Sequence, residues 1–158
     1  MSKKPADSQR RIVNRKARHD YHILQTVEAG LALTGSEVKS LRAGQAQLTD
    51  AFVRLNGYEA TLYNSQIDRY PPATDRNHEP KRNRRLLLHR GEIRKLEAEL
   101  AQKGVTLIPL TIFFNERGLA KVELGVAIGK KQYDKRQDLK KREHQREMDR
   151  AVRRPPRG

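Results

Sequence analysis

The run LTDAFVRLNGYEATLYNSQI, residues 48–67, has the pattern of a β-hairpin. Residues 51–55 and 58–63 are rich in aliphatic and aromatic side chains, and Asn56-Gly57 separates them. Asn and Gly tolerate positive φ angles, which the type I′ turn of a tight hairpin requires at both central positions. The run therefore predicts two antiparallel strands joined at Asn56-Gly57.

A second hairpin is expected further along the chain. VTLIPLTIFF, residues 105–114, is apolar on both faces and predicts a buried strand. In LAKVELGVAI, residues 119–128, apolar residues alternate with Lys121 and Glu123, which predicts a strand with one face in the core. The NERG segment between them indicates the turn.

Other local patterns predict the elements around these hairpins. Thr34 and Glu37 have the spacing of a capping box, and Gly44 stands where the helix would stop. In residues 70–85, three prolines and a run of charges indicate a surface loop. Before this helix, which spans 34–44, Tyr21, Ile23 and Val27 at even spacing predict a strand with a bend or bulge at Gly30. After the loop, a helix is expected over 91–104, with Ile93, Leu96 and Leu100 on one face.

Short strands joined by hairpin turns are typical of a closed antiparallel barrel, which leaves no long open edge. We therefore expect a mainly β fold. It would be a small antiparallel OB-like barrel, residues 19–128, with two or three short α-helices and a basic C-terminal tail. A chain of 158 residues has room for one such domain plus extensions.

Most of the positive charge lies at the two ends of the chain. Residues 1–18 carry seven Lys and Arg against one Asp, and residues 129–158 carry twelve against five Asp and Glu, out of a formal charge of +15. Neither end has apolar residues enough for a core, so residues 1–18 are expected to be a disordered arm. The tail, residues 129–158, is expected to hinge at Gly129, to be disordered when free and to become helical on RNA. The charge favours a polyanionic partner.

Several other functions receive less support. The chain has no cysteine for disulfides or thiolate metal sites and no apolar run that would span a membrane, so we expect a cytoplasmic protein. Nothing in the sequence suggests a dimer, a cofactor or a metal, so a monomer without either is expected. His19 and His22 would point to opposite faces of a strand, which disfavours a metal pair. GVAIGKK, residues 125–131, departs from a phosphate loop in its spacing and at Lys131. A general RNA-binding or ribosomal protein, a membrane-surface binder and a nuclease that uses Asp50, Asp68 and Glu123 are the alternatives.

One basic cluster fits contacts to phosphates, with a solvated charged loop as the alternative. It comprises Arg76, Lys81, Arg82, Arg84 and Arg85. Aromatic residues make up only 5% of the chain, so there is no row of rings to stack on the bases of a single strand. The pattern favours recognition of a folded RNA by its shape and backbone.

Eight blocks of sequence together resemble the SsrA-binding protein family, SmpB. They are NRKARHDY from Asn14, EAGLAL from Glu28, GSEVKSLRAG from Gly35, DAFV from Asp50, NHEPKR from Asn77, LLLH from Leu86, KVELG from Lys121 and GKKQYDKR from Gly129. The resemblance runs in order over about residues 14–150. The chain departs from the usual pattern at Ile128, where a basic residue is common, and at Arg85, where Lys is usual.

The resemblance implies an OB-like barrel that binds transfer-messenger RNA at its tRNA-like end and brings it to stalled ribosomes, and that is not an enzyme. It implies a tail that enters the decoding centre and the empty mRNA channel. The RNA-binding residues it implies are Asn14, Lys16, Arg18, His19, Glu28, Lys39, Arg42, Leu88 and Lys121. The ribosome-binding residues it implies are Lys130, Lys131, Tyr133, Asp134, Lys135 and Arg136.

Overall fold

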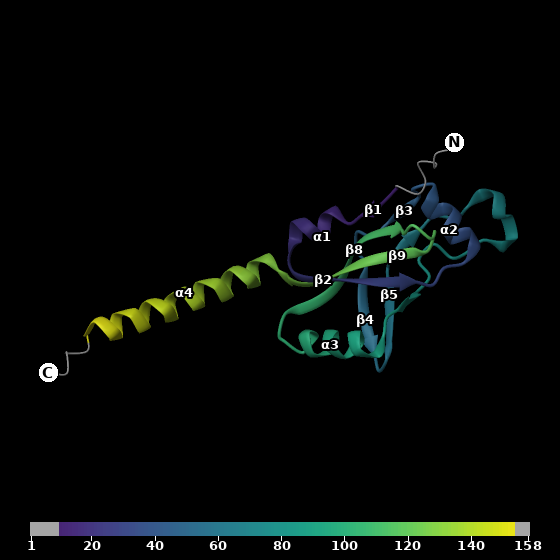
Figure 1. Ribbon diagram of the computed structural model, residues 1–158. Helices are drawn as coiled ribbons and strands as arrows, with labels where there is room; N and C mark the ends of the chain where they lie inside the picture. The colour runs from purple at the N-terminus through teal and green to yellow at the C-terminus, as the bar shows by residue number, and fades with distance from the viewer. Residues whose placement is uncertain (1–9, 154–158) are drawn as a thin grey trace.

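The computed structural model describes residues 10–153 and consists of a β-barrel from which one long helix projects (Figure 1). The strands are β1 (Ile12–Val13), β2 (Tyr21–Leu31), β3 (Ala46–Gln47), β4 (Phe52–Asn56), β5 (Glu59–Tyr63), β6 (Gln66–Ile67), β7 (Arg84–Leu87), β8 (Val105–Phe114) and β9 (Ala120–Gly129). The helices are α1 (Arg15–Asp20), α2 (Gly35–Arg42), the 3-10 helix η2 (Pro71–Arg76), α3 (Arg90–Leu100) and α4 (Lys130–Arg153).

The strands close into a ring. Pairing runs in the order β8-β4-β5-β7-β2-β9, and β9 pairs back onto β8. Every pairing is antiparallel. Inward side chains such as Leu62, Leu107 and Leu124 fill the interior. The closed ring confirms the predicted mainly β, OB-like barrel, and closure removes the unpaired edges that an open sheet would expose.

The first hairpin is confirmed, but its turn differs from the prediction. Asn56 pairs with Glu59, so the central residues are Gly57 and Tyr58. Gly57 has a φ of 64° and Asn56 is not among the residues with positive φ, which fits a type II′ turn rather than type I′. This register places Phe52 opposite Tyr63, and their rings stack at 5.3 Å. Cross-strand aromatic packing thus accompanies the observed turn.

The second hairpin, β8 with β9, is confirmed, and two irregularities shape the barrel. The register shifts between Pro109 and Thr111, where proline has no N–H to donate to the ladder. The bulge in β2 lies between Ile23 and Gln25 rather than at Gly30, where the sequence had suggested it. Gly30 has another role, because a Cβ there would lie 3.1 Å from the Leu87 Cβ of the neighbouring strand.

Both predicted helices form. Thr34 and Glu37 complete the capping box of α2, and Gly44 follows its end with a φ of 78°. In α3, Ile93 and Leu96 are buried against the barrel. The segment 70–85 is more ordered than a plain loop, since η2 occupies part of it and β7 begins at its end.

The prediction that residues 1–18 form a disordered arm is wrong for the part that the structure describes. β1 pairs with β8, and Asn14 caps α1. The Asn14 side chain donates to the carbonyls of Leu48 and Pro109 at 3.0 and 2.9 Å, which ties this segment to the barrel. Composition missed these contacts because they depend on one polar side chain rather than on apolar residues. Residues 1–9 lie outside the described range.

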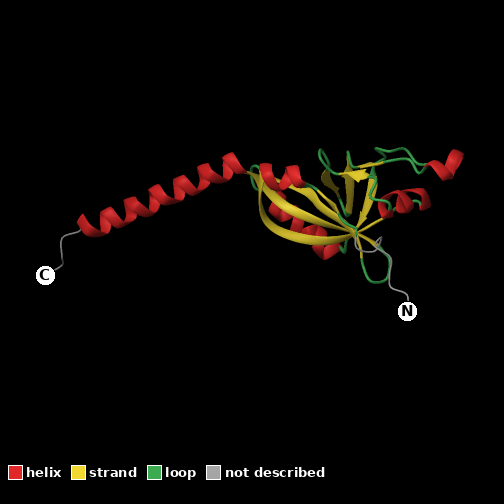
Figure 2. Cartoon of the chain, turned by 90° about the horizontal axis from the view of Figure 1, so that it is seen from above, coloured by secondary structure: helices red, strands yellow, loops and turns green. Residues whose placement is uncertain are grey.

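The structure also differs from the expectation of a tail that is disordered when free. Residues 130–153 form one straight helix that points away from the barrel, on the side opposite α2 and η2 (Figures 1 and 2). None of its residues is buried. Its Lys, Arg, Gln and Glu are strong helix formers, and Gln145 donates to Asp149 one turn on at 3.1 Å. That the tail is disordered when free and becomes helical on RNA stays a prediction.

Residues 154–158 of the predicted tail lie outside the described range. Within residues 10–153, no helix has the length and hydropathy needed to cross a membrane.

Candidate nucleic-acid interface

A buried carboxylate joins α2 to β7 and to the segment that precedes it. Glu37 is fully buried and accepts from Arg82 Nη2 at 2.6 Å and from Arg84 Nε at 2.7 Å. Arg84 is also fully buried and donates to Ser65 Oγ and to backbone carbonyls, so the guanidinium is surrounded by acceptors. Buried charges with this many partners fix the relative positions of the elements that carry them.

A second polar link holds the same two segments together. Ser36 Oγ lies 2.8 Å from His78 Nδ1, and His78 Nε2 lies 2.8 Å from the carbonyl of Ile67. Ser36 and His78 are both buried. The inner face of α2 is therefore fully engaged, and Lys39 and Arg42 are left on its exposed face. There the Arg42 guanidinium lies 5.1 Å from the centre of the Phe114 ring.

The environment of Glu37 strongly favours its charged form. Burial acts to raise the pKa of Glu37, but the hydrogen bonds from Arg82, the Thr34 N–H and Arg84 outweigh it and hold this pKa at about 2, against an ordinary value of 4.5. A carboxyl with a depressed folded-state pKa stabilises the protein above its unfolded-state pKa. Its contribution is lost as the pH falls toward the folded-state value.

We therefore expect acid to destabilise the barrel through Glu37. About 3 kcal/mol of unfolding free energy should be present above pH ~5 and should disappear progressively down to pH ~2. Urea unfolding at a series of pH values measures this loss. A Glu37→Gln variant should lack this component of the pH dependence, whereas Glu79→Gln, which removes an exposed carboxyl, should retain it. Equal acid profiles for the wild type and Glu37→Gln would contradict the assignment.

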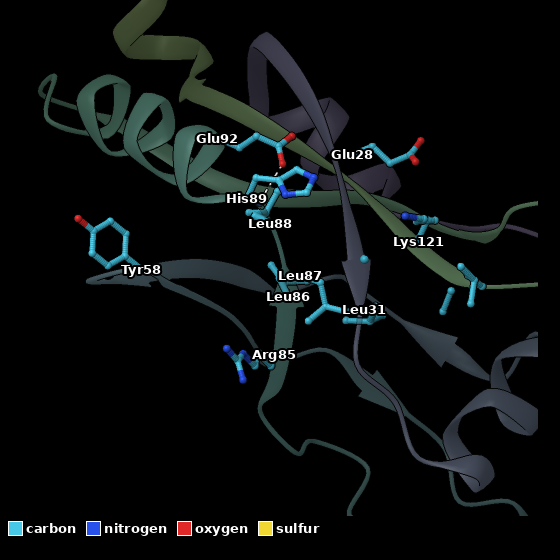
Figure 3. Close-up of a pocket in the computed structure, with 13 residues that line it drawn as sticks. Glu28, Leu31, Tyr58, Arg85, Leu86, Leu87, Leu88, His89, Glu92 and Lys121 are labelled. Atoms are coloured by element: carbon cyan, nitrogen blue, oxygen red, sulfur yellow. Dashed lines mark hydrogen bonds between the residues drawn. The ribbon is translucent and has the colours of Figure 1, made fainter.

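A pocket of about 520 Å³ opens beside β2, β7 and β9 (Figure 3). It brings together three residues that the sequence resemblance assigned to RNA binding, namely Glu28, Leu88 and Lys121. Figure 3 shows Glu28 and Lys121 on one side of it, with leucines of β7 across its floor. A hollow lined by both leucines and charged side chains suits an unstacked base next to a backbone phosphate.

Three basic residues of α1 lie on the surface, where each has an acidic neighbour. Lys16 pairs with Asp50 at 3.5 Å and Arg18 with Glu123 at 3.4 Å, and the side chains of both basic residues remain more than half exposed. Exposed pairs of this kind are weak and can exchange for phosphate contacts. His19 is 87% exposed and lies 3.1 Å from Asp20.

Asn14, which the resemblance assigned to RNA binding, lies inside the fold. It is 3% exposed, and its amide bonds to the carbonyls of Leu48 and Pro109 while its oxygen caps α1. These contacts give Asn14 a role in the fold, and its assignment to RNA binding stays a prediction.

The acidic residues proposed for a nuclease are not assembled into a site. Among residues 10–153, no three His, Asp or Glu side chains gather as a metal site would require. Asp50 and Glu123 pair with basic residues of α1, and Asp68 accepts from Gln66 at 3.1 Å. The geometry therefore gives this alternative no support.

The first two turns of α4 rest on the barrel. The Tyr133 ring stacks on His22 of β2 with centroids 3.8 Å apart, and Arg136 donates to the carbonyl of Lys103. The Gln132 side chain lies over Gly104. These contacts set the direction in which the tail leaves the barrel. The other predicted ribosome-binding residues are exposed: Lys130, Lys131, Asp134 and Lys135.

Comparison with known proteins agrees with this architecture. A family model described as SmpB protein matches residues 11–154. The chain belongs to the SmpB family. An SsrA-binding protein of Salinispora arenicola is 55% identical over 156 residues, 98% of each chain, and that of Desulforamulus reducens is 55% identical over 140 residues, 89% of this chain and 87% of the relative.

A solved SmpB structure is also similar. It is described as "tmRNA-SmpB: a journey to the center of the bacterial ribosome", and it is 53% identical, with a TM-score of 0.66 over 76% of this chain and 84% of the other. At 53% identity the two chains are alike in sequence as well as in fold.

The structure accounts for the two positions, 128 and 85, at which the sequence departs from the usual SmpB pattern. Ile128 is fully buried, so it belongs to the core and makes no phosphate contact. Arg85 is exposed at the rim of the pocket and keeps the basic charge.

The predicted phosphate cluster is partly wrong. Arg84 is fully buried and Arg82 is held by the same Glu37 carboxylate, so neither is free for RNA. The sequence identified Glu37 only as a capping residue and missed its ion pairs. The one available signal was a carboxylate on the inner face of a short helix, where an unpaired charge would not be tolerated.

Proposed function

We propose that this protein binds transfer-messenger RNA at its tRNA-like domain and delivers it to stalled ribosomes for trans-translation in the cytoplasm. The observation that carries the proposal is the 53% identity to a chain described as tmRNA-SmpB in the bacterial ribosome, together with the family match over residues 11–154. The protein would act by binding alone, without a catalytic step. Its two basic regions, the barrel surface and α4, suit two RNA partners.

The RNA-binding surface that we propose lies on the barrel. Exposed charges on α1 and α2 would contact phosphates, and the pocket beside β2 and β9 would hold a base. The residues concerned are Lys16, Arg18, His19, Glu28, Lys39, Arg42, Leu88 and Lys121. Glu28 is the one carboxylate of the set, and it would orient the RNA through an accepted hydrogen bond rather than neutralise a phosphate.

We assign the tail to the ribosome. On a helix, Lys135, Arg142, Arg146 and Arg153 fall within an arc of roughly 40°, which creates one basic stripe along α4. The helix leaves the barrel on the side opposite α2, so one molecule can hold transfer-messenger RNA at one end and reach into the decoding centre and mRNA channel with the other (Figure 1). Lys130, Lys131, Tyr133, Asp134, Lys135 and Arg136 would lie at the entrance.

Binding to the tRNA-like domain should depend strongly on salt, because each neutralised phosphate releases counterions. Replacing Lys39 and Arg42 together by alanine should reduce the slope of log affinity against log salt by about 1.5. Fluorescence anisotropy with the labelled tRNA-like domain measures the slope. The matched control replaces Lys140 and Lys141 of α4, which removes the same charge from the tail. Equal slopes for the two double variants would remove α2 from the interface.

A further inference from the structure

An exposed tyrosine at the tip of the first hairpin gathers two arginines of α3. The guanidinium carbons of Arg90 and Arg94 lie 4.7 and 5.9 Å from the centre of the Tyr58 ring. Arg94 Nη2 also donates to the Tyr58 hydroxyl at 3.2 Å. Cation–π contacts and this hydrogen bond hold two flexible side chains in place before any ligand arrives.

The local electrostatics of this cluster are unfavourable without an anion. Arg90 and Arg94 are one turn apart on α3, a spacing at which like charges repel. Both lie toward the N-terminus of the helix, where the helix dipole also disfavours positive charge. Among the described residues, no Asp or Glu lies within ion-pair distance of either arginine. Among the described residues the two guanidinium groups thus form no ion pair, although the Glu92 carboxylate lines the same pocket.

The cluster adjoins the RNA-binding pocket. Tyr58 lines the pocket together with Glu28 and Lys121, and Figure 3 shows it on the side opposite Lys121. Leu87 and Leu119, large apolar side chains that are 55% and 54% exposed, also line the pocket, and Figure 3 shows Leu87 between Tyr58 and Lys121. An RNA strand that contacts Lys121 and places a base over Leu87 would next meet Tyr58.

We propose that Arg90 and Arg94 form a second phosphate-binding site for the same RNA, with Tyr58 as the positioning residue. The proposal rests on the proposed function and adds a contact that the family motifs do not include. Guanidinium groups bind phosphate oxygens through paired N–H donors, which suits a backbone phosphate on the far rim of the pocket. The RNA would then be held on both sides of the pocket.

The test compares two double variants in anisotropy titrations with the tRNA-like domain of transfer-messenger RNA. Replacing Arg90 and Arg94 by alanine should weaken binding at least tenfold and make the salt slope shallower by about 1.5. The control replaces Lys95 and Lys103 by alanine, an equal loss of charge from α3 and the residues that follow it. It should change affinity less than threefold, and urea unfolding should show that all variants fold.

Two variants of Tyr58 test whether its ring positions the two arginines. Tyr58→Phe keeps the ring and should bind nearly as the wild type does, whereas Tyr58→Ala should lose roughly half of the free-energy effect of the double arginine variant. If the wild-type protein binds the tRNA-like domain but the arginine and lysine double variants have the same affinity and the same salt slope, this inference is overturned and the proposed function stands. Failure of the wild-type protein itself to bind the tRNA-like domain would overturn both.

Discussion

Replacing Glu37 by glutamine is expected to destabilise the barrel by about 3–5 kcal/mol, because it leaves the fully buried Arg84 without its carboxylate and also removes the partner of Arg82, whose side chain is 38% exposed. Glu37 and Arg84 are both fully buried, and Arg82 is bound to the same carboxylate. The glutamine has nearly the same shape, so the loss would arise from charge and not from a cavity. Urea unfolding at neutral pH measures the difference in free energy.

The control for this prediction is Glu79→Gln. Glu79 pairs with Arg69 at 3.5 Å, but both side chains are well exposed, so the change should cost less than about 1 kcal/mol. Similar losses in the two variants would show that burial of the Glu37 pairs contributes nothing special. A loss below 1 kcal/mol in Glu37→Gln would contradict the structural role given to this network.

Replacing Asp134, Lys135 and Arg136 together by alanine is expected to abolish alanine transfer to a stalled peptide while leaving binding to transfer-messenger RNA intact. The three residues lie in the first two turns of α4 and none of them belongs to the RNA-binding set proposed on the barrel; Arg136 also ties the helix to the carbonyl of Lys103. A reconstituted assay with stalled ribosomes and charged transfer-messenger RNA measures the transfer, and anisotropy measures the binding.

The matched control is the triple alanine variant of Asp138, Lys140 and Lys141. It removes one acidic and two basic residues from the exposed surface of the same helix, so the change in net charge is identical. It should retain most of the transfer activity, because these residues make no contact with the barrel at the start of the tail. Normal transfer by the first variant would contradict the role given to the tail entrance.

Much of the barrel could be predicted because its signals are local. The hairpins, the capping box of α2 and the apolar face of α3 each depend on residues close together in the chain. The type of the first turn could not be predicted, because it accompanies the cross-strand stack of Phe52 on Tyr63. The order of residues 12–20 depends on Asn14 and carbonyls far away in sequence, which no local pattern reveals.

The candidate site was predictable in its charge but not in its contacts. Basic residues between 76 and 85 appear equivalent in the sequence, yet Arg84 is buried whereas Arg85 is exposed at the pocket. Only the alternation of β7 across the sheet separates the two. The pairing of Tyr133 with His22 was also invisible, since it joins the tail to a strand more than one hundred residues away.

The most direct test of the proposed function is to isolate the tagged full-length protein from its own cells and sequence the RNA that remains bound after a moderate salt wash. We predict one dominant small stable RNA with a tRNA-like end, transfer-messenger RNA, and its loss in a variant that carries Lys39→Ala, Arg42→Ala and Lys121→Ala. Ribosomal RNA in proportion to its cellular abundance, with no enrichment of transfer-messenger RNA, would contradict the account.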